Sequence, residues 1–476
     1  MSLLTFVHHT SDRKTNIIGI PLTLNFSDGV VYVIDSGRVK ETRMENNMTK
    51  LVETWTSFAS TRQRKGRAGR TRPGIVYKLF SRKQSLKLAA QQDPEILRIP
   101  LEQLCLSVKA MGEKNVEGFL SRALTPPSLT AIQSALRTLE DLNALDGASG
   151  ELTPLGRHMA DIPADLRIAK MLIFGSVFRC LEPVLVIAAC MSVKSPFLSP
   201  MEKRTEAQAK KMQFATAKSD LLTAWKAYDT WDKLRESGAG RAELKSFCEE
   251  NYLSTNTLFE IQNLKVQYLE VLESIGFTSK DADQTRIRRR SERYSCEQDN
   301  ANSDNMALVK AIILSGLYPN VIKIKMPDAK FDKMIAGAVE RETVTKEIRM
   351  FTKDDGRVFL HPSSILFQSN QYQVPFLVYF SKLETTKIFV HDATMVPMYG
   401  LLLFGGAVHV DHLGRGLEIG DGFIKLRAFA RIGVLVNQLK KLLDAVLQAK
   451  ISNPDLNVSE SPVVETMVKL VSTDGI

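Results

Sequence analysis

Residues 30–37 read VVYVIDSG, in which a continuous β-branched and aromatic run ends at the turn residues Asp35, Ser36 and Gly37. A run of this kind predicts a strand that is buried on both faces. A second short strand is predicted at residues 75–80. The polar stretch 38–55 between the two strands alternates around Asn46-Asn47, which predicts a β-hairpin. Two strands joined by a crossover are typical of an α/β domain.

The segment before the second strand is strongly basic, because residues 63–70 read QRKGRAGR. Arginines three residues apart place two guanidinium groups on one side of a short helical turn, and the glycines let its backbone approach another surface. Guanidinium groups stay charged and match the oxygens of a transferring phosphoryl group. The alternatives are a general nucleic-acid patch and an exposed basic turn.

From about residue 81 the apolar spacing becomes helical. Helices followed by the short apolar segment 151–153 predict a winged-helix module, and residues 161–276 predict a helical bundle. Residues 281–305 are charged and Asn-rich, which predicts a solvated linker, although five arginines there also suit phosphate. Short alternating segments after Gly316, with LLLFGG at 401–406 among them, predict a small β-barrel. A closing amphipathic helix is predicted at 432–449, with Lys440 and Lys441 on its polar face.

The composition excludes several classes of protein. The 476 residues are 44% hydrophobic and 24% charged, which excludes wholesale disorder and a collagen-like fibre. A net charge of +10 favours polyanionic partners, although it also fits a solvated basic surface. Five scattered cysteines predict neither a disulfide framework nor a metal site, and they favour a reducing compartment. Since no signal peptide or bilayer-spanning segment is predicted, the expected location is the cytoplasm, with the nucleus as the alternative.

Taken together, VVYVIDSGRVKE and QRKGRAGRTRPG resemble the second RecA-like domain of DEAH-box RNA helicases of the RNA-helicase-A type, whose motif VI has the same run. The stretches PEILRIPLEQLCLSVKAMG, LTPLGRHMADIPADLRIAKMLIFGSVF and AIILSGLYPNVIKI are similar to the family's winged-helix, ratchet and oligonucleotide-binding (OB) fold regions. The resemblance covers about residues 28–449, and its finer likeness is to the branch linked to translation initiation.

The resemblance implies a multidomain fold with α/β, α and β parts: a partial RecA-like domain, a winged helix, a helical bundle or ratchet, and an OB-fold β-barrel. The expected domains follow the chain in order: an atypical N-terminal segment at 1–27, the remainder of the second RecA-like domain at 28–81, the winged helix at 82–160, the ratchet at 161–280, the linker or insertion at 281–305, the OB fold at 306–430 and a helical extension at 431–476.

The resemblance also implies roles for single residues. Arg67 and Arg70 would be arginine fingers, and Gln63 would contact the γ-phosphate or its water. Gly66 and Gly69 would let the turn approach the nucleotide, and Asp28 stands where the family keeps an acidic residue near the ribose.

A second group of residues is predicted to contact nucleic acid. Lys40 and Arg43 lie on the predicted hairpin, although basic side chains there are more often merely solvated. His361, Ser363 and Ser364 belong to an HPSS run with donors suited to phosphate, and His361 equally fits a structural histidine. Thr385, Thr386 and Lys387 are further candidates.

The sequence also departs from the family pattern. Thr15-Asn16-Ile17 begins like the family's motif V, but the Ala-Glu-Thr-Ser portion does not follow. The sequence contains neither a phosphate-loop motif nor a D-E-x-H tetrad, so a first RecA-like domain is missing and the chain alone is predicted to have no ATPase activity. The expectation is therefore a fragment or truncated product of a longer helicase.

The expected function is the C-terminal part of an ATP-dependent RNA helicase, which supplies arginine fingers and a channel for single-stranded RNA in an RNA-remodelling or translation-related enzyme. ATP with Mg²⁺ would serve the full-length enzyme, and no tight cofactor binding is expected of this chain alone. The alternative is an inactive module that binds RNA or a ribonucleoprotein. Candidate partners are single-stranded RNA, a ribosome or ribonucleoprotein, and a glycine-patch protein; DNA is a weaker alternative to RNA.

Overall fold

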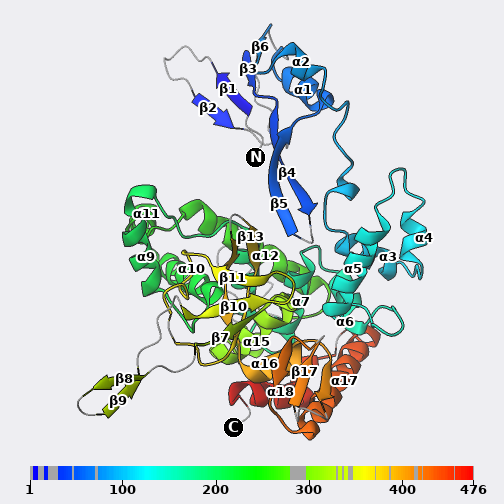
Figure 1. Cartoon of the computed structure of the whole chain (residues 1–476), viewed down its shortest axis with the longest axis vertical. Coiled ribbons are helices and arrows are strands. Elements are labelled where there is room, and N and C mark those ends of the chain that lie inside the picture. Colours follow the sequence, from blue (N-terminus) through cyan, green and yellow to red (C-terminus); the bar gives the residue numbers. More distant parts are fainter. Residues whose placement is uncertain are drawn as a thin grey trace. The chain divides into compact units, whose positions relative to one another are not determined.

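The computed structural model describes residues 4–8, 16–19, 30–45, 48–69, 73–278, 296–327, 331–334, 337–340, 347–369, 371–384, 387–411, 416–420, 422–454 and 456–474 (Figure 1). The chain divides into two compact units. The first comprises Met1–Leu101 and Asn115–Ala135, and the second comprises Glu102–Lys114 and Leu136–Ile476.

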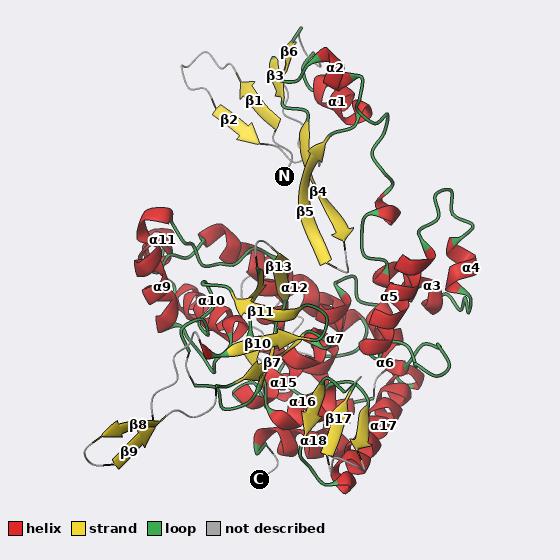
Figure 2. Cartoon of the chain, viewed as in Figure 1, coloured by secondary structure: helices red, strands yellow, loops and turns green. Residues whose placement is uncertain are grey.

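The first unit contains a four-stranded sheet in the order β2-β1-β3-β6 (Figure 2). Strand β1 is antiparallel to both β2 and β3, whereas β3 is parallel to β6, and α1 lies on the crossover between them. This confirms the predicted α/β crossover. The elements are β1 (Leu4–His8), β2 (Asn16–Gly19), β3 (Tyr32–Asp35), α1 (Phe58–Lys65) and β6 (Ile75–Lys78).

The prediction that the first of these strands is buried on both faces is wrong, and the second strand is also exposed on one face. In β3, Val33 and Asp35 are buried beside α1, but Tyr32 and Ile34 are partly exposed on the opposite face. In β6, Tyr77 is 52% exposed. The apolar run correctly indicated a strand, but α1 covers one face of it, and a sequence run does not show how many layers cover a sheet.

The predicted hairpin is confirmed as strands β4 (Arg38–Glu45) and β5 (Met48–Trp55). Its Asn46-Asn47 tip lies outside the described residues. The first unit also contains three short helical elements: α2 (Arg82–Ser85), η1 (Glu95–Leu97) and α4 (Val116–Leu120).

The winged-helix region contains α3 (Glu102–Ala110), α5 (Leu129–Asp141), which passes from the first unit into the second, and α6 (Pro154–Ala160). An antiparallel bridge joins Leu145 to Leu152, where the short apolar segment was predicted. A Cβ at Gly156 would lie 2.0 Å from the Ala144 carbonyl oxygen, so α6 packs against the preceding turn only because this residue is glycine.

The predicted helical bundle follows, and its core is apolar. Trp231 and Tyr228 on α10 pack with Leu258 and Ile261 on α12. The bundle contains α7 (Leu166–Val177), α8 (Leu181–Ser192), η2 (Met201–Lys203), α9 (Arg204–Gln213), α10 (Asp220–Glu236), α11 (Arg241–Glu250), α12 (Thr255–Ser274) and α15 (Met306–Leu317).

The segment predicted as a solvated linker, 281–305, is folded where the structure describes it. Residues 279–295, with the five arginines, lie outside the described part. Residues 297–300 form α14 (Glu297–Asn300), in which Asp299 is 5% exposed, and Asn300 Oδ1 accepts a hydrogen bond from the Glu182 backbone at 2.8 Å. Asn300 therefore bonds the backbone of the first turn of α8 instead of solvating a loop.

The β-rich region forms a seven-stranded sheet in the order β13-β14-β11-β10-β7-β12-β15, and β8 pairs separately with β9. Its core contains Ile322, Val358, Leu377 and Val390. The strands are β7 (Val321–Lys325), β8 (Phe331–Met334), β9 (Gly337–Glu340), β10 (Arg349–Thr352), β11 (Gly356–Leu360), β12 (Phe376–Val378), β13 (Ser381–Glu384), β14 (Ile388–His391) and β15 (Thr394–Met395).

One predicted strand is wrong, because LLLFGG belongs to helix α16 (Met398–Phe404). Residues 400–404 are all buried, so no polar face marks the helical period, and a short apolar run between Pro397 and Gly405 fits either structure.

The C-terminal region pairs β16 (Val408–Asp411), β17 (Gly416–Ile419) and β18 (Ile424–Leu426) beside α17 (Ala430–Ser452), η4 (Val458–Glu460) and α18 (Pro462–Ser472). The predicted closing helix is confirmed, but Lys440 does not lie on a solvated face. Its Nζ donates to the Gly405 and Gly406 carbonyls at 3.2 and 2.7 Å. No helix in the described part of the chain has the length and apolarity needed to cross a bilayer.

Candidate nucleotide turn and nucleic-acid interface

The basic turn follows α1, which is fixed to the sheet by a buried ion pair. Arg64 Nη1 lies 2.8 Å from Asp35 Oδ1, and each side chain is 1% exposed. The same guanidinium donates from Nη1 and Nη2 to the Arg38 carbonyl at 3.2 Å, and Asp35 Oδ1 also accepts from the Gly37 backbone at 2.9 Å. The first arginine of QRKGRAGR therefore joins the end of α1 to the end of β3.

Three residues predicted at the nucleotide lie on the accessible side of this turn. Gln63 and Gly66 are exposed, and Arg67 is partly exposed. Within the described residues, Arg67 forms no ion pair with a carboxylate. In the described part of the first unit, the Arg67 side chain is therefore partly accessible and is not paired with a carboxylate.

The two glycines of the turn differ in conformation. Gly69 has φ +87°, a left-handed region that favours glycine, whereas Gly66 has φ −67°, which any residue adopts. Arg70 and Asp28 lie outside the described residues, so the predictions for them stay predictions.

In the hairpin register, Lys40 lies opposite Glu53 and Arg43 opposite Lys50, while the side chains of Lys40 and Arg43 lie outside the described part. At the base of the hairpin, the Arg38 guanidinium lies 3.7 Å from the centre of the Trp55 ring, which is 36% exposed. This Arg–Trp stack is an accessible aromatic and cationic feature of the first unit.

In the second unit, the HPSS run adjoins the N-terminus of α10. Ser364 is 3% exposed, and its Oγ donates to Asp220 Oδ2 at 2.7 Å. The backbone of Ala393 donates to the same oxygen at 3.0 Å, and that of Ile365 donates to Asp220 Oδ1 at 2.8 Å. The structure thus corrects the predicted phosphate contact of Ser364, because its hydroxyl is buried and already donates to a carboxylate.

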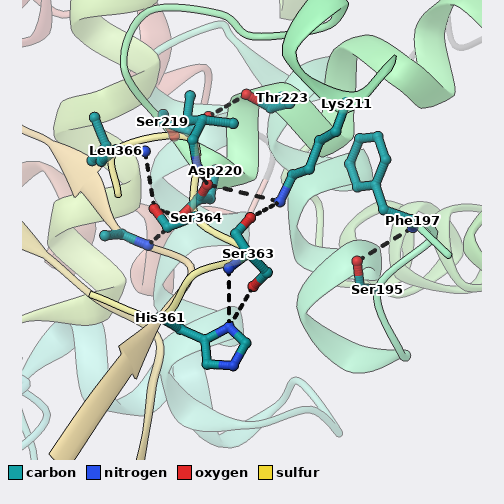
Figure 3. Close-up of polar contacts among 12 residues, drawn as sticks. Ser195, Phe197, Lys211, Ser219, Asp220, Thr223, His361, Ser363, Ser364 and Leu366 are labelled. Carbon is teal, nitrogen blue, oxygen red and sulfur yellow. Dashed lines mark hydrogen bonds and ion pairs between the residues drawn. The ribbon is translucent and has the colours of Figure 1, made fainter. Parts of the chain in front are cut away.

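In Figure 3, Ser363 lies between His361 and Lys211; Ser363 is exposed and His361 is partly exposed. His361 Nδ1 lies 2.7 Å from Ser363 Oγ, and it accepts from the Ser363 backbone at 3.2 Å. Lys211 Nζ donates to the Ser363 carbonyl at 2.7 Å and lies 4.0 Å from Asp220 Oδ1. The run therefore links the bundle to the sheet through Asp220 and Lys211, and it leaves His361 and Ser363 accessible in part.

Four rings lie on adjacent strands next to this run: Phe359 and His361 at β11, and Phe389 and His391 on β14. We call them the ring ladder. The two phenylalanine centroids are 6.2 Å apart, and the two histidine rings stack at 4.0 Å with an angle of 28° between their planes. All four are partly exposed. Lys387 Nζ lies 4.8 Å from the Phe359 centroid, which places this predicted contact residue at the ring ladder. Thr385 and Thr386 lie outside the described residues.

The local charges act on the two histidines and on Asp392. Burial and the Lys211 charge lower the pKa of His361, and burial and His361 lower the pKa of His391. Burial and the Asp220 carboxylate raise the pKa of Asp392 to about 6. Both histidines are therefore neutral near pH 7. Within the described ranges, no group of histidine, cysteine, aspartate and glutamate side chains is arranged to hold a metal ion.

Sequence reasoning missed Arg64–Asp35, Asp220 and the ring ladder. One signal was present for the ring ladder: residues 357–361 read RVFLH, and residues 387–391 read KIFVH. No local signal connects Asp220 with Ser364, because the two are 144 residues apart.

Four family models match the chain. They are described as the winged-helix part of the helicase-associated domain (residues 135–164), its ratchet-like part (165–224), the oligonucleotide/oligosaccharide-binding (OB) fold (309–408) and the C-terminal domain in RNA helicases (416–473). These matches confirm the predicted winged helix, ratchet and OB fold.

The chain is also similar to curated proteins along almost its whole length. It is 40% identical to a DEAH-box ATP-dependent helicase of Mycosarcoma maydis over 93% of the chain and 29% of the relative. It is 40% identical to the ATP-dependent RNA helicase DHX57 of Homo sapiens (97% and 34%), and 39% identical to the ATP-dependent DNA/RNA helicase DHX36 of Bos taurus (96% and 44%). The chain spans less than half the length of each of these relatives.

Proposed function

We propose that this chain, which is homologous to the C-terminal part of DEAH-box ATP-dependent helicases, contributes arginine side chains to ATP hydrolysis and a surface that grips single-stranded RNA. The observation that carries the nucleotide role is the buried Arg64–Asp35 pair, because it fixes the turn from which Gln63 and Arg67 are accessible. A fixed turn can hold a guanidinium ready for a phosphoryl group without reorganisation.

The chemistry assigned to the turn is phosphoryl transfer. The Arg67 and Arg70 guanidinium groups would neutralise charge on the transferring γ-phosphoryl group, and Gln63 would orient the attacking water. Gly66, Gly69 and Asp28 would lie against the nucleotide. A phosphate loop and the ligands of Mg²⁺ are also needed, and the sequence contains no phosphate-loop motif. ATP with Mg²⁺ would thus bind together with a lobe that carries them, and this chain alone would not turn over ATP.

The RNA role rests on the second unit. Its OB fold is matched by a model of an oligonucleotide- or oligosaccharide-binding domain, and His361, Ser363 and Lys387 lie next to the ends of the neighbouring strands β11 and β14. Cations and polar donors of this kind hold the phosphate backbone largely regardless of sequence. Lys40 and Arg43 on the hairpin would add contacts from the first unit.

A second candidate function is a non-catalytic module that binds RNA or a ribonucleoprotein. The missing phosphate-loop motif favours it, because the described arginines then have no nucleotide to act on. A ribosome and a glycine-patch protein are the further partners of an RNA-remodelling or translation-related role. The five free, buried cysteines fit a reducing compartment such as the cytoplasm or nucleus.

One experiment separates the two functions. Arg67→Ala is made in a protein that joins this chain to a lobe with a phosphate loop, and both ATP turnover and RNA binding are measured. Turnover that falls by about 10³-fold or more, with RNA binding retained, supports the enzymatic role. Unchanged turnover points to the binding module. The exposed Arg62→Ala, on the helix that precedes this turn, is the matched control.

A further inference from the structure

Two five-residue segments of the OB fold repeat the same order of side chains. RVFLH at 357–361 and KIFVH at 387–391 each read cation, β-branched residue, phenylalanine, aliphatic residue, histidine. They lie on β11 and β14, which are parallel neighbours with Phe359 opposite Phe389 and Leu360 opposite Val390. Each residue of one segment therefore lies beside the residue of the same type in the other segment.

The alternation sorts each segment into two faces. Val358, Leu360 and Val390 are buried in the core of the sheet. Because side chains alternate along a strand, the cations, phenylalanines and histidines lie on the other face, where the four rings stay partly exposed. The buried core of the sheet does not include these four rings, so packing of that core does not explain why they are aromatic.

Two cations converge on one of these rings. The Arg357 guanidinium lies 5.1 Å from the Phe359 centroid, and Lys387 Nζ lies 4.8 Å from it. Phe389 is also 6.1 Å from His361 at nearly a right angle. Two cations beside one partly exposed ring can attract an anion, and a flat group would gain ring contact beside it.

We infer that the ring ladder, with Arg357 and Lys387, is a platform on which unpaired bases of single-stranded nucleic acid stack while the two cations hold the adjoining phosphates. This deepens the proposed RNA role and rests on it. In single-stranded nucleic acid, flat bases alternate with negatively charged phosphates. Any of the bases can stack on an aromatic ring, so such binding does not depend on the sequence. The strand is thus held by its bases as well as by its backbone.

The test compares two fluorescein-labelled single strands of about 12 nucleotides, a length within the site size of an OB fold. One is oligouridylate, and the other is an abasic oligomer of the same length and charge. Fluorescence anisotropy with the full chain should give an affinity for oligouridylate at least about tenfold higher, as expected when one or two bases stack.

The variant Phe359→Leu with Phe389→Leu keeps the apolar volume and removes the π faces. It should lower the affinity for oligouridylate to that for the abasic strand and leave abasic binding unchanged. The matched control is Phe429→Leu, since Phe429 is 72% exposed and the Arg431 guanidinium lies 5.3 Å from its centroid, but it lies outside the ring ladder.

Each outcome has a distinct meaning. Equal affinity of the wild-type chain for both strands overturns the platform and leaves the RNA role standing, whereas binding of neither strand overturns both. Polyglutamate of equal charge that binds as tightly as oligouridylate would show a general anion patch and overturn the platform. If the double variant does not fold, the wild-type chain is tested with oligonucleotides that contain the fluorescent base 2-aminopurine. Stacking quenches the fluorescence of this base, so an unchanged fluorescence in the complex contradicts the proposal.

Discussion

Arg64 and Asp35, 29 residues apart, form an ion pair of 2.8 Å in which both side chains are 1% exposed. A buried pair of this kind adds little net stability compared with apolar residues, but each partner depends on the other. Among the described residues, Asp35 Oδ2 and Arg64 Nε make no hydrogen bond, whereas Asp35 Oδ1 also accepts from the Gly37 backbone and the Arg64 guanidinium also donates to the Arg38 carbonyl. The only opposite charge that either group contacts there is that of the other.

Removal of one partner should therefore destabilise the first unit. We expect Arg64→Met to lower the free energy of unfolding by about 3–5 kcal/mol, because the Asp35 carboxylate stays buried without its cation. Urea unfolding gives the size of the loss, and hydrogen exchange of the β3 amides gives its location. Arg62→Met, at an exposed site on the same helix, is the control. Equal stability of the two variants would contradict the structural role of Arg64.

Ser364 should matter for stability and not for RNA. We expect Ser364→Ala to cost about 1–3 kcal/mol, because Asp220 Oδ2 loses a hydrogen bond in a buried site. Affinity for single-stranded RNA should stay unchanged in anisotropy titrations. Ser363→Ala changes an exposed hydroxyl in the same run and is the control for stability. A stable Ser364→Ala chain with weakened RNA binding would instead place this hydroxyl at the phosphate.

Protonation of the two stacked histidines should lower the stability of the fold as the pH decreases. The pKa of His361 and of His391 is lowered from the ordinary 6.5, so the unfolded chain takes up these protons at a higher pH than the folded chain. The free energy of unfolding therefore decreases as the pH falls below about 6.5, toward the lower pKa of each histidine in the folded chain. Lys211 and Asp220 are the other charged groups that act on the pair.

The comparison variant is His361→Gln with His391→Gln. Denaturant unfolding at about pH 7.5 and about pH 5.5 should show a steeper loss for the wild-type chain than for the variant. Asp392, with its pKa raised to about 6, works in the opposite direction, but it is present in both proteins and its effect largely cancels in the difference. Identical pH dependence of the two proteins would mean that the rings are not held in their neutral form.

Lys387 should contribute to RNA binding through charge. We expect Lys387→Gln to weaken binding of every single-stranded sequence about equally. The slope of log K against log salt should become smaller by about 0.7, the value for one lost phosphate contact on a single strand. Lys441→Gln, at an exposed lysine of α17, is the control. A salt slope that stays at the wild-type value would show that Lys387 does not reach a phosphate.

Local patterns in the sequence predicted most of the architecture. Helical spacing gave the bundle, the polar stretch around Asn46-Asn47 gave the β4–β5 hairpin, and short alternating runs gave the strands of the OB fold. Prediction failed where burial hides the period, as in α16, whose residues Gly400–Phe404 are all buried. It also failed for the face of the sheet on which Tyr32 and Ile34 of β3 are partly exposed.

The candidate sites were only partly predictable for a related reason. QRKGRAGR indicates a candidate functional turn, but only the fold shows that Arg64 is buried while Arg67 stays partly accessible. HPSS contains two serines that the sequence does not distinguish. Only the contact with Asp220, which is distant in the sequence, shows that the Ser364 hydroxyl is buried while that of Ser363 is exposed. The RVFLH and KIFVH segments become informative once β11 and β14 are known to be parallel neighbours.

The Asp220 carboxylate accepts three hydrogen bonds from residues between 364 and 393 while it begins a helix of the bundle. If the sheet moved relative to that helix, the buried Asp220 carboxylate would lose these three hydrogen-bond donors. The bundle and the sheet are therefore expected to move as one rigid body. In the proposed RNA role, a change of contact with a bound strand would then come from surface side chains or from movement of this body relative to other parts of the protein.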